Sequence, residues 1–240
     1  MIRTAIYLIK TLIVAITALL FGSCTGVSGN GKIKADNRVV DQSFTGIEVS
    51  SGLSAYVSQG DKTSITVEAD DNLLPLIQTE VSNGVLKIYS KQNLQNGSSV
   101  HVYVTLPQVN SLQAQAGSLL ESKTVLKSGA ITLESGSGSE IDVTLQATNV
   151  SCTSGSGSSM ALKGVAVSIT ASSTSGSSLD AKGLKVEEAK AQASSGSSLS
   201  VSPSKHVKAS ASSGASVTYY TEGGITADTE ASSGGSVSKG

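Results

Sequence analysis

The chain has 240 residues, of which 15% are charged and 3% are aromatic, with no tryptophan and a formal net charge of −1. Lys and Glu are scattered without a basic stripe, which argues against nucleic acid or an acidic membrane surface as a partner. A globular core of this length would normally contain more large rings, whereas a thin core does not need them. We therefore expect one elongated domain.

The N-terminus has the pattern of an export signal. Arg3 and Lys10 precede an apolar run over residues 11–21, which is too short to span a membrane as a helix. We predict a lipoprotein signal peptide over residues 1–23. The run ends in Gly22-Ser23-Cys24, which resembles a bacterial lipobox, and this resemblance implies that Cys24 is lipidated and begins the mature protein. An ordinary secretory signal with an incidental cysteine is the alternative.

A short linker is expected next. Residues 24–37 would form the lipidated cysteine and a flexible tether, because residues 25–32 are rich in Gly and Ser. Thr25 rather than Asp follows the cysteine, which by resemblance to Gram-negative sorting rules implies the outer membrane. The leaflet, periplasmic or surface, stays open.

Residues 38–116 contain short alternating segments without a fixed period. Alternation of apolar and polar residues predicts strands, and it occurs at 47–49, 55–57, 65–67, 85–88 and 100–104. Gly60-Asp61 and Asn83-Gly84 predict turns between strands. Residues 71–75 could form one helical turn. This half should form wider, irregular coils or a cap.

From Gly117 to the end, residues 117–240, the chain repeats about every nineteen residues. Glycines recur at 117, 138, 157, 176, 196, 214 and 234, with spacings of 21, 19, 19, 20, 18 and 20. Most lie in a Ser-Gly-Ser phrase. A fixed period in this range is typical of a stacked solenoid.

The apolar residues keep a fixed place in each repeat. One lies three residues after each glycine, and others lie seven and five residues before the next one. Apolar residues two apart share one face of a strand, so each repeat should be two short strands. One such unit cannot bury enough surface to offset its conformational entropy. A flexible Ser/Gly linker or a β-sandwich would not require this register. We predict an all-β, single-domain parallel β-solenoid over residues 38–240, in the form of a right-handed β-helix.

Several motifs of residues 38–240 are similar to one known family. They are the segments 44–49 and 56–60, followed by 71–74, 84–88, 104–107 and the Ser-Gly-Ser coils. In order and spacing they resemble the head-GIN domain family of putative auto-transporter adhesins. The resemblance implies a parallel β-helix on secreted or lipid-anchored proteins of Gram-negative envelopes.

No group of residues has the spacing of a catalytic or metal site. His101 should face outward from a strand, and His206 should lie in a loop. Cys152 falls in the inward ladder and should be a small buried hydrophobe. We therefore expect no catalytic residues, no metal and no cofactor.

Paired carboxylates would be needed for general acid–base chemistry. The candidate pairs are Asp70 with Asp71, Glu140 with Asp142, and Glu187 with Glu188. No ladder of carboxylates is expected along the solenoid. Nor is a strip of aromatic residues for sugars, since Tyr219 takes an inward position and leaves only Tyr220 as a surface contact.

Three functions remain open. The preferred hypothesis is a non-enzymatic, lipid-anchored cell-envelope protein, an adhesin or ligand-binding rod whose partner is an envelope protein or a glycan. A polysaccharide lyase or hydrolase would be favoured if carboxylates converged with Lys or Arg in one groove. A structural element that associates end to end through its C-terminal coil would be favoured by an uncovered last coil.

Overall fold

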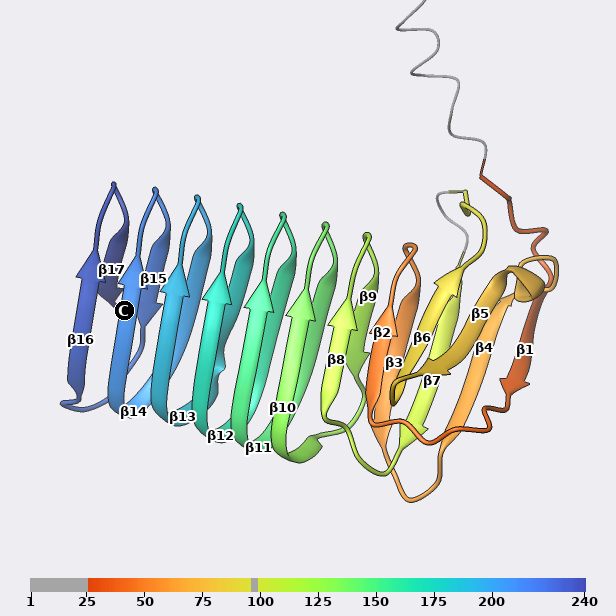
Figure 1. Ribbon diagram of the computed structural model, residues 1–240, viewed down its shortest axis with the longest axis horizontal. Coiled ribbons are helices and arrows are strands. Elements are labelled where there is room, and N and C mark those ends of the chain that lie inside the picture. Colours follow the sequence, from red (N-terminus) through yellow and green to blue (C-terminus); the bar gives the residue numbers. More distant parts are fainter. Residues whose placement is uncertain (1–25, 96–98) are drawn as a thin grey trace, which may run out of the picture.

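The computed structural model describes residues 26–95 and 99–240. Over these residues the chain is an all-β solenoid of stacked coils (Figure 1). Parallel pairing joins each regular coil to the next, so the parallel β-solenoid predicted from the repeat is confirmed. Nowhere in these two ranges is there a helix long and apolar enough to cross a membrane.

Two walls enclose the core. Wall A contains, in spatial order, β5, β6, β2, β8, β10, the second halves of β11–β14, and β16. Wall B contains β1, β4, β7, β3, β9, the first halves of β11–β14, β15 and β17. The strands are β1 (Ile33–Arg38), β2 (Gly46–Val49), β3 (Ser54–Gln59), β4 (Ser64–Asp70), β5 (Ile77–Ser82), β6 (Val85–Ser90), β7 (His101–Leu106), β8 (Ser111–Ala114), β9 (Leu119–Ser122), β10 (Leu126–Ser135), β11 (Glu140–Ser154), β12 (Ser159–Ser173), β13 (Ser178–Ala193), β14 (Ser198–Ala211), β15 (Ser216–Tyr219), β16 (Thr226–Ala231) and β17 (Ser236–Lys239).

Each Ser-Gly phrase forms the tight turn between the walls. In one coil Ser137 and Gly138 have φ of 53° and 71°, and the Ser139 amide donates to the Gly136 carbonyl at 3.2 Å. Two successive residues with positive φ define a type I′ turn, which explains why glycine returns at this position. The turns also stack, since the Gly138 amide donates to the Ser156 carbonyl of the next coil at 3.1 Å. They form the aligned upper edge in Figure 1.

The serine after each turn glycine points inward. The Ser158 hydroxyl lies 2.9 Å from the Ser135 carbonyl of the preceding coil and accepts a hydrogen bond from the Gly155 amide at 3.1 Å. It therefore satisfies buried backbone groups and ties two coils together. Equivalent buried serines are Ser118, Ser139, Ser177 and Ser197. In the last two coils Ala215 and Gly235 take this position.

The predicted inward ladder is buried along most of the solenoid. Ile131, Val150, Ile169, Ala189 and Val207 are each 3% exposed or less. The next member, Ala227, is exposed, as is every residue of β16. In the described structure β16 pairs only with β14, so the final expected core positions have no coil to cover them.

The N-terminal end is organised differently. β4 pairs antiparallel with both β7 and β1, and β5 pairs antiparallel with β6. These strands cap the end of the rod, so the region contains both irregular coils and a cap. The expected helical turn is present as a short 3-10 helix, Leu74–Leu76.

The tether is shorter than we expected from its composition. β1 begins at Ile33, so residues 33–37 belong to the folded cap rather than to a flexible segment ending at residue 37. The six residues of β1 pair in continuous register with β4, from Ile33 with Asp70 to Arg38 with Ile65. Even before β1, Val27 forms a parallel bridge with Leu94.

The coil made by β2 and β3 lies out of sequence order. β2 sits between β6 and β8, and β3 sits between β7 and β9 (Figure 1). After β1 the chain forms this coil, leaves it to complete the cap, and then returns on both of its sides.

Candidate functional site

A groove opens where one coil is shorter than its neighbours. The glycine spacing of 18 residues between Gly196 and Gly214 lies between two spacings of 20. On one side β13 bulges, because Ala181 pairs with Val201 and the next pair is Lys185 with Ser202. On the other side β15 stops opposite Val201 and pairing resumes only at β16. Residues 202–205 therefore lie recessed between the bulge at 182–184 and the loop at 220–225.

The groove has a volume of about 530 Å³, within the range of small-ligand sites. Its lining comes from β12, β13, β14 and the 220–225 loop, and it includes Val165, Val186, Ser202, Pro203, Ser204 and Tyr220. Val165 is 53% exposed at its margin. The arrangement offers apolar surface beside polar groups, which can hold a ligand without covalent chemistry.

Charged side chains surround this groove. Lys185, Glu187 and Glu222 line it. The Lys205 ammonium lies 2.6 Å from the Glu187 carboxylate, and the hydrogen bond with Glu187 raises the pKa of Lys205. The Lys182 ammonium lies 4.1 Å from the centroid of the Tyr220 ring, a cation–π contact that brings a residue of the bulge to the loop.

Tyr220 was the surface contact expected from the sequence, and the structure places it in the groove. His206 does not lie in a loop as we predicted: β14 runs without a break from Ser198 to Ala211, through Pro203. A proline is tolerated in this strand because, among the described strands, none pairs with residues 202–205 on the groove side. His206 lies near the groove, with its Nε2 3.1 Å from the Asp228 carboxylate.

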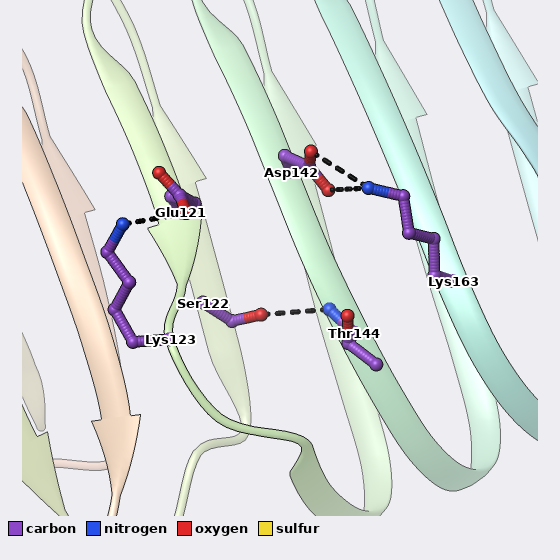
Figure 2. Close-up of polar contacts among 6 residues, drawn as sticks. All are labelled: Glu121, Ser122, Lys123, Asp142, Thr144 and Lys163. Carbon is purple, nitrogen blue, oxygen red and sulfur yellow. Dashed lines mark hydrogen bonds and ion pairs between the residues drawn. The ribbon is translucent and has the colours of Figure 1, made fainter.

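The expected carboxylate pairs do not form acid–base pairs. Glu140 and Asp142 both face away from the core, and the strand neighbour of Asp142 is Glu121 of the preceding coil. Figure 2 shows that both carboxylates have lysine partners: Glu121 with Lys123 at 2.7 Å, and Asp142 with Lys163 at 3.0 Å.

This cluster on wall B connects coils. Lys163 of β12 reaches back to Asp142 of β11, and the Thr144 amide donates to the Ser122 hydroxyl at 2.8 Å (Figure 2). Both contacts join one coil to the next. We interpret the cluster as a structural tie, whose exposed ion pairs add modestly to stability.

In each of the other two candidate pairs, one carboxylate has a lysine partner: Asp71 with Lys34 and Glu187 with Lys205. Asp71 accepts a hydrogen bond from Asn30 and lies 3.1 Å from the Lys34 ammonium, and these partners lower the pKa of Asp71. It holds the N-terminal cap. The pairing of β13 shifts register between Val186 and Glu188, and Glu187 lines the groove whereas Glu188 is exposed opposite His206 of the next strand.

An aromatic cluster that we did not expect lies on wall B. The rings of Tyr56 and Tyr103 stack with centroids 5.2 Å apart, and His101 lies 5.6 Å from Tyr56. The Lys123 ammonium lies 4.3 Å from the Tyr56 centroid. The sequence indicates Tyr220 as the single aromatic surface contact, and this cluster adds a second group of aromatic side chains. Tyr56 and Tyr103 meet through the pairing of β3 with β7, and no local sequence pattern reveals such a contact.

The two cysteines lie in different parts of the chain. Cys152 is buried, and burial raises the pKa of its thiol to about 12, so it is the small core residue that we predicted rather than a nucleophile. Cys24 and the predicted signal peptide lie outside the described residues. Among residues 26–95 and 99–240, no group of three or more His, Cys, Asp or Glu side chains could hold a metal ion.

Comparison with known proteins identifies the family. Residues 43–223 match the family model described as "Putative auto-transporter adhesin, head GIN domain". The chain belongs to this family. The resemblance inferred from its N-terminal motifs and Ser-Gly-Ser coils is thereby confirmed, and the match extends through the groove to Gly223.

Solved structures share the head-GIN fold at low sequence identity. A putative adhesin from Bacteroides fragilis is 17% identical with a TM-score of 0.82, covering 89% of this chain and 100% of its own. A putative adhesin and a putative lipid binding protein, both from Parabacteroides distasonis, have TM-scores of 0.71 and 0.72 at 20% and 18% identity, each covering 90% of this chain and 100% of its own. At this identity they establish the fold alone. No match was found among curated proteins.

Proposed function

We propose that this head-GIN protein is a lipid-anchored rod of the bacterial cell envelope that binds a ligand rather than transforming it. The groove at the 18-residue coil carries this proposal, because it joins apolar surface, an aromatic ring and charged groups in one concave site. The names of the related adhesins support a binding role. The partner class stays as we expected from the sequence, an envelope protein or a glycan.

Binding is tested with the purified full-length chain in detergent. A glycan array and purified envelope proteins are the probes. We expect at least one class of ligand to be retained, and Tyr220→Ala to weaken its binding about tenfold. Tyr89→Ala is the matched control, because Tyr89 lies on β6 at the opposite end of the rod. Retention that Tyr220→Ala leaves unchanged would place the binding site elsewhere.

Anchoring through Cys24 is a separate part of the proposal. Two or three acyl chains hold a protein stably on a membrane, whereas one chain does not. We expect the full-length chain, produced in a Gram-negative host, to incorporate labelled palmitate and to fractionate with the outer membrane. Cys24→Ala should incorporate none. Labelling of the variant at the wild-type level would refute the lipobox interpretation.

A polysaccharide-active enzyme is the second candidate. Glu187, Glu222, Lys185 and Tyr220 line one groove, which is the convergence of carboxylates and a lysine named above as favouring this class. Against it, the Glu187 carboxylate is already held by Lys205. Incubation with polyuronates and neutral polysaccharides decides between the two. New reducing ends, or unsaturated products that Glu222→Gln and Lys185→Gln abolish, would establish the enzyme.

A further inference from the structure

The two walls of the groove differ in charge. Lys182 and Lys185 come from the bulged strand β13, and neither belongs to an ion pair among the residues that the structure describes. Glu222 lies across the groove in the 220–225 loop. Glu187 does not offset the lysines of the bulge, because Lys205 neutralises it at 2.6 Å. The ammonium groups of Lys182 and Lys185 therefore have no ion-pair partner among the described residues, although the Asp180 carboxylate lies close by and accepts a hydrogen bond from the Lys182 amide at 2.9 Å.

The bulge directs this charge toward the ligand space. Lys182 extends from β13 past the recessed strand β14, since its ammonium reaches the Tyr220 ring at 4.1 Å. Lys185 lines the groove directly and follows the bulge at the point where pairing with Ser202 resumes. A bound anion near Tyr220 would thus meet two ammonium groups that have no carboxylate partner to give up.

The remaining lining suits a ring that carries hydroxyl groups. The Tyr220 ring and the exposed Val165 offer apolar surface on which the C–H groups of a pyranose ring can pack, above the buried Pro203 and Val186. Glu222 can accept hydrogen bonds from sugar hydroxyls. The floor is formed by Ser202, Pro203 and Ser204, whose two hydroxyls already donate to carbonyls of β13.

We propose that the groove selects an anionic saccharide, with its ring against Tyr220 and its negative group at Lys182 and Lys185. This inference rests on the proposed function and narrows its ligand. Lysine binds carboxylate and sulfate alike as a point charge, so the shared chemistry is a negative group on a sugar ring. Charge attraction at an exposed site also weakens with salt.

The test compares three trisaccharides of equal length on the full-length chain by calorimetry: a galacturonate trimer, a sulfated galactose trimer and the neutral galactose trimer. We expect the anionic trimers to bind at least tenfold more tightly than the neutral one, and the preference to shrink as salt is raised. The ratio between the two anionic trimers identifies the group that the site prefers.

Variants locate the effect. Lys185→Gln and Lys182→Gln should each reduce binding of the anionic trimers several-fold and so narrow their preference over the neutral trimer. Lys208→Gln is the control, because Lys208 is exposed on wall A of the same coil as the groove floor. Equal binding of all three trimers, with no effect of the lysine variants, would overturn the anionic preference and leave the binding function standing.

Two further outcomes separate the hypotheses. Binding of hexaglutamate that depends on Lys182 and Lys185, without binding of any trimer, would replace the saccharide by an acidic peptide. If ligand is retained and Tyr220→Ala does not weaken it, the groove is not the binding site and this inference falls; if the chain retains no ligand of any class, the proposed function falls with it.

Discussion

The two ends of this rod differ in how far their strand edges are covered. At the N-terminal end, antiparallel strands β1, β4 and β5 close the walls over a core with large side chains such as Ile47 and Leu86. At the other end the parallel stack continues without such a cap in the described structure, and its inward residues shrink to alanine at 189, 191, 193, 209 and 211. A repeat can therefore specify a fold while its stability varies along the rod.

The largest effect should come from breaking the regular core. Ile169 is 2% exposed and lies between Val150 and Ala189 in the ladder. Ile169→Asp should cost about 4 kcal/mol or more and unfold several coils, because a carboxylate without a partner is buried. Thr170→Asp is the control, since Thr170 faces water. Thermal melts that fall equally for both variants would contradict the register.

The next effect tests the backbone of the regular stack. Gly164 has φ of 113°, and a Cβ there would lie 2.0 Å from the Leu145 carbonyl oxygen of the preceding coil. Gly164→Ala should lower the free energy of unfolding by at least about 2 kcal/mol. At Gly129 no described residue other than its two chain neighbours lies within 4 Å of an added Cβ, so Gly129→Ala should change the free energy of unfolding by less than about 0.5 kcal/mol. Denaturant titration measures both, and similar values would show that the close approach does not matter.

A smaller effect sharpens the contrast between middle and end. Ser158→Ala should cost about 1–3 kcal/mol, because its hydroxyl partners the Ser135 carbonyl and the Gly155 amide. Ser159→Ala, on the exposed face, should be nearly neutral. In the penultimate coil, Ala215→Ser should restore the missing contact and raise the unfolding free energy. A loss of stability in this reciprocal variant would mean that the turn serine is not transferable.

The smallest effect concerns the last coil. Amides of β16 and β17 should exchange with deuterium faster than those of β11, because strand edges without a further partner open most easily. We also propose weak end-to-end association through this edge, which analytical ultracentrifugation of the full-length chain in detergent can detect. A strictly monomeric protein at high concentration would leave only rapid exchange. Slow exchange in β16 would contradict the expectation that the rod is less stable at this end than in the middle.

The regular coils could be predicted because their information is local. Glycine spacing and alternation identified the turns and the inward residues from Leu120 to Val217, all of them buried. The insertion of β2 between β6 and β8 could not be predicted, because it depends on pairings between residues far apart. The Tyr56–Tyr103 stack was missed for the same reason.

The groove could be predicted only in part. Its signal, a spacing of 18 between two of 20, is visible in the sequence. The spacing does not show where the extra residues of the two neighbouring coils lie, or whether they form a bulge in a strand or a loop. Only the pairing shows that residues 182–184 bulge and that 220–225 form a loop, so that Lys182 reaches Tyr220. Tyr220 itself was found because an outward tyrosine in a Ser/Thr-rich stretch is conspicuous.

The displaced coil of β2 and β3 sets an order of assembly. Val49 pairs with Ala114, which lies far along the chain, whereas Asp142 in the regular stack pairs with Ala161 of the next coil in sequence. In a growing chain the first coil therefore waits with both edges open until β6, β7, β8 and β9 have emerged. Long loops must close before those contacts form, which makes such pairing slow. We expect this coil to act as the nucleus, after which each later coil adds rapidly to a finished template, so that the length of the rod can change without altering the step that limits its folding.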